Sequence, residues 1–210
     1  MTCPLCKASD TLLFHNDKSR EYYQCQECFL VYTSTDFYLS SVDEKKRYNL
    51  HQNSDETEGY RKYLEKVSLP VMQRFDIDHK GLDFGCGPGP LLYEMFVEAG
   101  YAMQKYDVFY EPNLEVLKQQ YDFITMTEVI EHLHKPSQVL KQLFDMLAKK
   151  GSLVVMTNLY TDKAGFTSWW YKNDLTHVCF FHTKSLEWIA QKFEADLEYL
   201  SKEVFIFTKS

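Results

Sequence analysis

Residues 82–90 read Leu-Asp-Phe-Gly-Cys-Gly-Pro-Gly-Pro, and this stretch decides the fold. An apolar run leads into it and helical spacing follows it, so it predicts a turn from a strand into a helix. Gly85 and Gly87 have no Cβ and let the backbone pass close to a ligand, while the helix presents unpaired N–H groups at its start. Such a turn binds either a dinucleotide pyrophosphate or the amino-acid part of S-adenosylmethionine.

An acidic residue lies on each side of this turn. Asp83 precedes the glycines within the expected strand. Asp107 follows Gly87 by about twenty residues, at the end of the next expected strand, where a carboxylate can accept hydrogen bonds from ribose hydroxyls. With these residues, stretch 82–90 resembles the first motif of class I S-adenosylmethionine-dependent methyltransferases, and residues 106–108 (Tyr-Asp-Val) resemble the acidic end of their second strand. The resemblance implies cofactor contacts from Asp83, Gly85, Cys86, Gly87, Asp107 and Val108.

Residues 121–133 (YDFITMTEVIEHL) support the same family. They resemble the fourth strand and following segment of the ubiquinone-pathway O-methyltransferase branch, which adds Thr127 and Glu128 to the cofactor contacts and places Glu131 and His132 beside the methyl-transfer site. Three interpretations stay open. Glu131 and His132 hold the loop by hydrogen bonds; or His132 is a general base, since an imidazole pKa of about 6.5 suits that role. In the third, Glu128, Glu131 and His132 hold a divalent ion, as in some relatives of that branch.

The chain between Asp107 and Tyr121 is short. The family normally fits a helix, a third strand and another turn there, so we expect the third strand to be very short or missing. The usual adenine contact at the end of that strand then has no counterpart, and Phe109 or Tyr110 is expected to cover the adenine. In the preceding N-terminal segment, Tyr48 or His51 is expected to close over the methionine end of the cofactor; an exposed polar helix is the alternative.

An aromatic segment, residues 159–182, follows the expected fifth strand. In this fold such a segment often forms a lid over the substrate. Its large rings can wall an acceptor or stack on a planar ring, or they can simply pack the loop onto the body. They are Trp169, Trp170, Tyr171, Phe180 and Phe181.

Residues 174–178 within that segment read Asp-Leu-Thr-His-Val. They resemble an Asp-Pro-Thr-His-Val segment of related bacterial methyltransferases, with leucine in place of the proline. His177 is therefore a second candidate base beside His132, and Asp174 is its candidate orienting partner.

Two CxxC pairs near the N-terminus predict a metal site. Cys3 and Cys6 form the first pair, and Cys25 and Cys28 form the second. A CxxC turn places both sulfurs on one side of a tight loop, and two such turns complete a tetrahedron around zinc, with iron as the main competitor. A four-cysteine site is closed, so we expect a structural zinc ribbon that presents substrate, binds a partner or stabilises the N-terminus.

Three regions follow from these patterns: a zinc-ribbon module in 1–35, a helical cap or linker in 36–78, and an α/β Rossmann-like domain in 79–210 with a mostly parallel sheet and flanking helices. Helical spacing around Tyr60 and Tyr63 predicts a helix that Pro70 interrupts. Further strands are expected at 81–84, 101–109, 121–126, 152–157, 196–200 and 204–208. Further helices are expected at 91–99, 136–149 and 183–193, the last capped by Thr183.

Composition narrows the function. The net charge of −7 and pI near 5.5 argue against sequence-independent binding of nucleic acid, which uses a surplus of Lys and Arg. No run is long enough to span a bilayer and no signal pattern opens the chain, so a cytoplasmic protein is expected. The predicted function is transfer of a methyl group to an O or N nucleophile of a small metabolite. An RNA or protein acceptor read by the ribbon, and a non-catalytic cofactor-binding subunit, are the alternatives.

Overall fold

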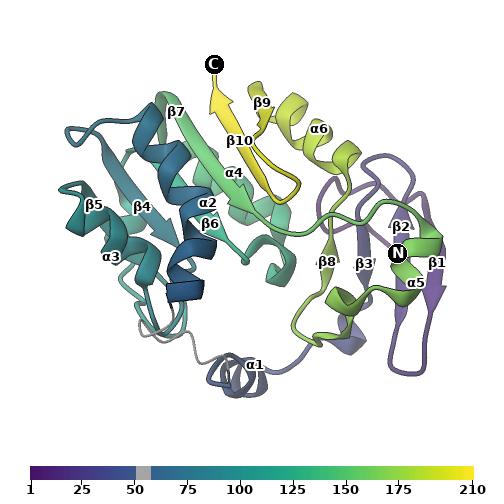
Figure 1. Cartoon of the computed structure of the whole chain (residues 1–210). Coiled ribbons are helices and arrows are strands. Elements are labelled where there is room, and N and C mark those ends of the chain that lie inside the picture. The colour runs from purple at the N-terminus through teal and green to yellow at the C-terminus, as the bar shows by residue number, and fades with distance from the viewer. Residues whose placement is uncertain (51–57) are drawn as a thin grey trace.

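A mostly parallel sheet forms the centre of the larger part of the molecule (Figure 1). The structure, a computed structural model, describes residues 1–50 and 58–210. The six strands lie in the order β5-β4-β6-β7-β10-β9, with β10 antiparallel to both of its neighbours and the other pairs parallel. This confirms the predicted fold class. The strands are β4 (Lys80–Phe84), β5 (Ala102–Tyr106), β6 (Tyr121–Thr127), β7 (Leu147–Met156), β9 (Ala195–Tyr199) and β10 (Val204–Lys209).

Helices cover both faces of this sheet because its strands are apolar on both sides. In β7, Val154 and Met156 pack against α2 (Glu58–Arg74) and α3 (Leu91–Glu98), and Leu153 and Val155 pack against α4 (Pro136–Met146) and α6 (Thr183–Lys192). The carboxyl ends of the four parallel strands therefore meet at one edge, where ligands of open α/β sheets bind.

A second sheet is antiparallel and lies beside the first (Figure 1). Its order is β1-β2-β3-β8, with β1 (Thr11–Asn16), β2 (Glu21–Cys25) and β3 (Val31–Thr33) from the N-terminus. The fourth strand, β8 (Cys179–Phe180), comes from the segment after β7, so the aromatic segment is built into the N-terminal sheet.

The two cysteine turns have the same backbone geometry. Lys7 and Phe29, each four residues after the first cysteine of its pair, both have positive φ, at 70° and 58°. In each turn the residue with positive φ donates its N–H to the carbonyl of the first cysteine. The N–H of that cysteine donates to the carbonyl of the next residue along, which is Ala8 in the first turn and Leu30 in the second. Repetition of one turn brings the two pairs together as equivalent halves.

The remaining described elements are short. Helices α1 (Ser41–Tyr48) and α5 (Lys163–Ser168) precede α2 and β8, and 3-10 turns span Thr35–Phe37, Val116–Lys118, Ile130–His132 and Trp170–Asn173. Within 1–50 and 58–210, β5 is the edge strand of the parallel sheet, and no further strand pairs with its free side. The chain between β5 and β6 forms the 3-10 turn η2 (Val116–Lys118). The expected loss of the third strand is confirmed for that part of the chain.

Several expected element boundaries are wrong. Helix α2 continues through Pro70, because Val67 and Val71 are fully buried against the sheet and outweigh a proline penalty of about 3 kcal/mol. Helix α4 stops at Met146, since Leu147 already pairs with Tyr121 of β6.

Two smaller corrections concern β5 and α6. Strand β5 ends at Tyr106, where Asp107 turns back to pair with Glu111. The side chain of His182, not Thr183, caps α6 by accepting from the Lys184 N–H.

Candidate active site

The glycine turn joins β4 to α3 in a left-handed backbone. Gly85 and Gly87 have φ values of 80° and 66°. A Cβ at Gly85 would lie 2.5 Å from Val129 Cγ2, so this glycine is required by the close approach of the chain after β6. A Cβ at Gly87 would meet no described atom within 4 Å. The turn therefore packs tightly on one side and borders open space on the other, as a cofactor cradle requires.

Asp107 holds the turn and faces the same space. Its Oδ2 accepts the Gly87 N–H at 3.1 Å, and its Oδ1 accepts the N–H groups of Phe109 and Tyr110 at 2.7 and 3.1 Å. A carboxylate has further lone pairs beyond these, so it can still accept ribose hydroxyls. Val108 beside it is 63% exposed, so its side chain is open to a ligand.

Asp83 and Cys86 lie beneath and within the turn. Asp83 is buried and accepts a hydrogen bond from Thr125 Oγ1 at 2.9 Å, and burial raises its pKa to about 7. Burial likewise raises the pKa of the Cys86 thiol to about 12, which keeps it protonated. Both residues thus border the cofactor space without carrying a full charge at neutral pH.

The end of β6 carries two polar groups aimed at the same edge. Thr127 Oγ1 is buried and has no hydrogen-bond partner among the described residues, which fits a hydroxyl that awaits a ligand. Glu128 has a φ of 52°, a left-handed backbone that is uncommon for glutamate. Its carboxyl accepts hydrogen bonds from Tyr63 Oη and Tyr171 Oη, both at 3.0 Å.

Glu128 and Glu131 form a buried carboxyl pair. Tyr171 Oη also lies 2.6 Å from Glu131 Oε1, and Thr157 Oγ1 donates to Glu131 Oε2 at 2.8 Å. Burial, followed by the charge of Glu131, raises the pKa of Glu128 to about 8, and burial raises the pKa of Glu131 as well. At neutral pH Glu128 is therefore largely protonated.

The pair predicts a pH-dependent preference for the cationic cofactor. A sulfonium nearby favours the ionised form of Glu128, so binding of S-adenosylmethionine below pH 8 must release a proton and weakens as pH falls. The neutral thioether S-adenosylhomocysteine lacks this dependence. We expect the affinity ratio of the two, measured by calorimetry, to rise with pH by up to about tenfold per unit below pH 8.

Substitution Glu128→Gln is expected to reduce that pH dependence between pH 6 and pH 9, because one titrating carboxyl is gone; Asp83 and Glu131 still titrate and account for what is left. Glu198→Gln, which alters an exposed partner of Arg74, is the matched control. A ratio in Glu128→Gln that depends on pH as steeply as in wild type contradicts the assignment.

His132 and His177 lie next to this pair. Their ring centroids are 4.6 Å apart, and His132 Nε2 lies 3.9 Å from Glu131 Oε1. His132 Nδ1 lies 3.2 Å from the Thr176 carbonyl and His177 Nδ1 lies 2.7 Å from the Tyr171 carbonyl. A carbonyl only accepts, so each neutral ring carries its proton on Nδ1 and keeps a lone pair on Nε2.

Burial controls the charge of both rings. It lowers the pKa of His132, and burial together with neighbouring His132 lowers the pKa of His177 to about 3. Asp174, the expected partner of His177, raises the pKa of His177 through its charge, and its Oδ1 accepts from Thr176 N and Oγ1 and from Arg47 Nε. Both histidines are thus neutral at pH 7, and Asp174 organises the loop.

Several residues of the site were not predicted from the sequence. Tyr63 was noted only as part of a helical face, and Thr157 only as a strand end; neither carries a motif, because their partners are distant in sequence. Tyr48, one of the expected cover residues, lies against His132 and Phe109, with ring centroids 5.4 and 5.8 Å away. His51 lies outside the described residues.

The adenine candidates lie beside α1. Phe109 contributes to a hollow of about 400 Å³ whose other walls come from α1 and Asn49. Tyr110 Oη donates to Asn49 Oδ1 at 2.6 Å. Phe109 and Tyr110 therefore remain the candidates for the adenine contact.

The four N-terminal cysteines meet at one point. Cys3 Sγ lies 3.6 Å from Cys28 Sγ, and Cys6 Sγ lies 3.3 Å from Cys25 Sγ, with all four sulfurs within 4.8 Å of one another. Disulfide sulfurs would be about 2 Å apart. A tetrahedral zinc ion places its sulfurs roughly 3.8 Å apart, given Zn–S distances of about 2.3 Å, so the cluster fits this metal.

Comparison with known proteins agrees with the fold. The methyltransferase-domain family matches residues 40–200 of this chain. The chain belongs to this family. It is an S-adenosylmethionine-dependent methyltransferase. No curated protein matches it in sequence. Within the described residues, no helix is both long and apolar enough to cross a membrane.

Solved methyltransferases share the fold at low identity. Magnesium protoporphyrin IX methyltransferase from Synechocystis, with bound S-adenosylhomocysteine, is 14% identical with a TM-score of 0.59, over 83% of this chain and 97% of that one. The 1,6-didemethyltoxoflavin-N1-methyltransferase from Burkholderia thailandensis is 12% identical with a TM-score of 0.55, over 93% and 98% of the two chains. The likeness therefore extends over nearly the whole of both enzymes.

Proposed function

We propose that this methyltransferase transfers a methyl group to an oxygen or nitrogen of a small metabolite, with His132 and His177 as its catalytic residues. One observation carries the proposal: two neutral imidazoles, each with Nδ1 fixed by a carbonyl, lie beside Glu131 at the sheet edge that bears the glycine turn. His132 is the proton acceptor, since its side chain is 17% exposed and its ring meets that of His177 edge to face.

The reaction is an in-line displacement. A lone pair of the acceptor forms the new bond to the methyl carbon, and the electron pair of the breaking bond returns to sulfur, which leaves as the thioether. The acceptor proton passes to His132 Nε2. Asp107, Gly85, Gly87 and Thr127 hold the cofactor, and alignment supplies most of the rate enhancement.

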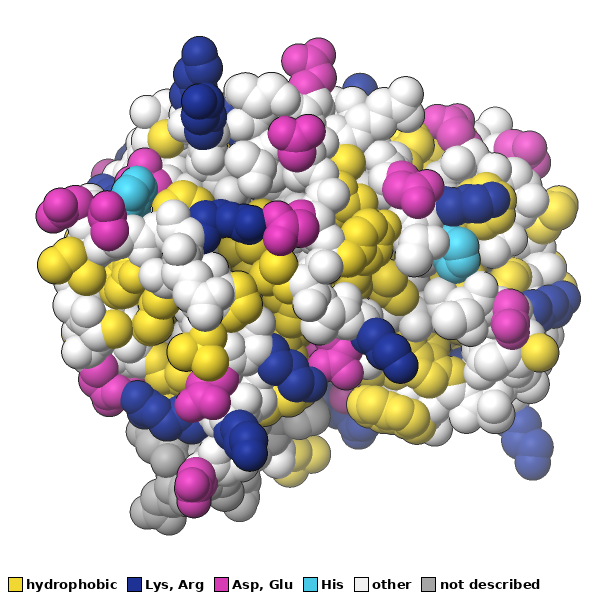
Figure 2. Space-filling view, turned by 45° about the horizontal axis from the view of Figure 1, so that its top comes forward, with side chains coloured by type: hydrophobic (Ala, Val, Ile, Leu, Met, Phe, Trp, Pro, Cys, Tyr) yellow, Lys and Arg dark blue, Asp and Glu magenta, His cyan; other side chains and the backbone are white. Residues whose placement is uncertain are grey.

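The aromatic segment packs mainly onto the body, because Tyr171, Phe180 and Phe181 are buried, and it bears on the acceptor through the Tyr171 hydroxyl. Trp169 and Tyr171 lie with ring centroids 4.9 Å apart, and Tyr171 reaches both glutamates. The solved relatives include enzymes named for a porphyrin and for a toxoflavin precursor. On the face in Figure 2 basic and acidic side chains are interspersed, whereas a surface for an RNA acceptor would gather basic ones.

One metal ion is part of the proposal, and a second is its alternative. Cys3, Cys6, Cys25 and Cys28 would hold a structural zinc ion, for which their sulfur spacing is suitable. A divalent ion near Glu128, Glu131 and His132 is the alternative to pure base catalysis. The ligand atoms that cluster within 4.8 Å are those of Glu131, His132 and His177. Metal analysis of purified protein, before and after dialysis against chelator, separates these cases.

The test of the function uses methyl-labelled S-adenosylmethionine and cell extract of the source divided by size. Label is expected in the fraction of small metabolites, with matching release of S-adenosylhomocysteine. Label in RNA or protein instead would overturn the small-metabolite acceptor. Cofactor binding without transfer to any fraction would indicate a non-catalytic subunit.

Substitution His132→Gln is expected to lower the rate of methyl transfer by about 10²–10⁴-fold, the usual contribution of a general base. Affinity for S-adenosylhomocysteine, measured by calorimetry, is expected to stay the same. His79→Gln removes an exposed imidazole far from the site and serves as the control. A wild-type rate in His132→Gln would remove His132 from the mechanism.

A further inference from the structure

The loop that carries His177 is bound to the N-terminal ribbon by one buried side chain. Arg20 immediately precedes β2, which ends at Cys25, and is 2% exposed. Its guanidinium donates to the carbonyls of Lys172, Asp174, Leu175 and His177, and its Nε donates to Tyr22 Oη. Every N–H of the guanidinium has a partner, so no donor of this buried cation is left unsatisfied.

The residues around this contact join the same two parts. Lys172 is buried and its Nζ lies 2.9 Å from Asp17 Oδ2, in the turn between β1 and β2. On the other side of His177, the Thr33 N–H of β3 donates to the Val178 carbonyl, and the Val178 N–H donates to the Glu131 carbonyl. The chain at 177–178 is thus held between the ribbon and the turn that bears His132.

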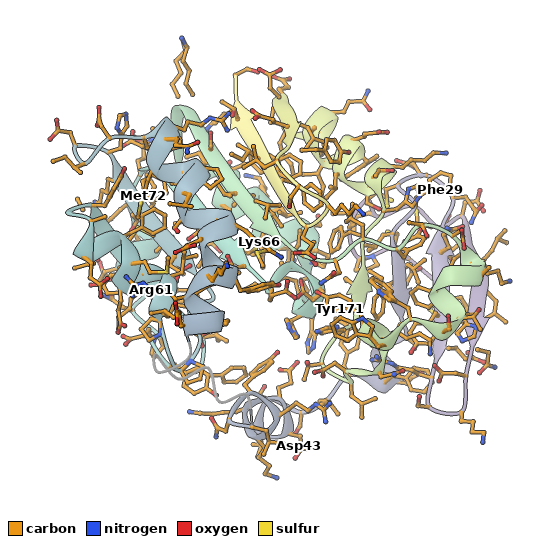
Figure 3. All side chains as sticks on the ribbon, in the orientation of Figure 1. Phe29, Asp43, Arg61, Lys66, Met72 and Tyr171 are labelled. Atoms are coloured by element: carbon orange, nitrogen blue, oxygen red, sulfur yellow. The ribbon has the colours of Figure 1, made fainter. Side chains whose placement is uncertain are left out.

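The cysteine turns reach the aromatic segment as well. Tyr160 Oη donates to the Phe29 carbonyl in the second cysteine turn and accepts from Gln24 Nε2 at 2.9 Å. Figure 3 places Phe29 in the N-terminal part that carries the cysteines, and Tyr171 between that part and the parallel sheet. The cofactor side is built differently, because the bonds around Asp107 come from Gly87, Phe109 and Tyr110, all in the parallel-sheet part.

We propose that Arg20 is a positioning residue that holds the His177 loop against the N-terminal ribbon. Metal in the four-cysteine cluster then determines the position of the His177 loop in the acceptor half of the site, and it leaves the cofactor half unaffected. This inference rests on the proposed roles of His177 and of the zinc ribbon. It gives the ribbon a role as one wall of the acceptor site. A metal ion held by Cys25 and Cys28 would fix the end of β2 and the loop before β3. The two strands would carry that fixed position to Arg20 and Thr33 at their other ends, which contact residues 172–178.

The test needs no acceptor. Long-range ¹H–¹⁵N spectra report the tautomer of each of the seven histidines, and a His177→Gln variant assigns the His177 signal. In wild type, His177 is expected to be locked with its proton on Nδ1. In Arg20→Met, which keeps the length and removes the donors, that signal is expected to move toward an averaged tautomer, while the dissociation constant for S-adenosylhomocysteine stays within about threefold of wild type.

Two further variants serve as controls for Arg20→Met. Lys18→Gln removes a positive charge from an exposed residue in the same turn and is expected to leave the His177 signal in place. Arg20→Lys keeps the charge with fewer donors and is expected to give an intermediate shift. If Arg20→Met does not fold, Arg20→Lys and metal-depleted wild type, prepared with a thiol-reactive mercurial and chelator, carry the same test.

An unchanged His177 signal in Arg20→Lys and in metal-depleted protein would overturn the proposal. Equal loss of S-adenosylhomocysteine binding would also overturn it, since the effect would then extend over the whole molecule. A shift in the Arg20 variants without one on metal depletion would remove the metal from the proposal. None of these readouts depends on methyl transfer, so failure of the proposed catalytic function is measured separately.

Discussion

Replacing Asp107 with alanine is expected to weaken binding of S-adenosylmethionine by about 10²–10⁴-fold, because two hydrogen bonds from ribose hydroxyls to a charged acceptor each contribute roughly 1.5–3 kcal/mol. The substitution also frees the N–H groups of Gly87, Phe109 and Tyr110, which Asp107 now accepts. Calorimetry with S-adenosylhomocysteine measures the loss, and circular dichroism shows that the fold is retained.

The control must remove another carboxylate that accepts a backbone N–H. Asp122 is suitable, since its Oδ2 accepts the Lys80 N–H at 2.8 Å at the opposite end of β4. Asp122→Ala is expected to lower the melting temperature to a similar extent as Asp107→Ala and to keep cofactor affinity. Equal affinities in the two variants would show that Asp107 acts only on the stability of the turn.

Much of the fold was predictable because its signals are local. The glycine turn and each CxxC pair span only a few residues and have few structural solutions, and Asp107 follows the glycines at a typical distance. The missing third strand followed from the short chain before Tyr121. Boundaries were less predictable. Pro70 stays inside α2 and Leu147 begins β7 because distant residues pack or pair with them, and no local pattern records that.

The catalytic side of the site was predictable only in part. His132 and His177 were identified by motif, and the structure brings their rings together. The groups that set their environment come from elsewhere. Tyr63 lies on α2, Thr157 follows β7, and Arg20 precedes β2, each with partners far along the chain. Such side chains have ordinary neighbours in sequence, so only the tertiary structure shows what they contact.

Zinc is expected to be present in the purified protein at one ion per chain and to be lost when Cys25 is replaced with serine. A structural zinc site contributes apparent free energies of about 10–16 kcal/mol in small zinc-binding peptides, and three remaining thiolates hold the ion far less tightly. The ends of β2 and β3 then lose their cross-link, so the N-terminal sheet is expected to unfold well below the rest of the chain. Plasma mass spectrometry gives the metal content, and thermal melting gives the stability.

Cys179→Ser is the matched control for this loss. Cys179 is a buried thiol of the same sheet that donates to the Leu133 carbonyl, and serine can make the same bond. It is expected to keep full zinc content. Iron in place of zinc would change the metal and keep the site, whereas metal-free wild-type protein with four reduced thiols would contradict the site itself.

Since β8 pairs with β3, a metal-free ribbon would also leave Phe180 without its partner Val31. The stability of the aromatic segment therefore depends on the same ion.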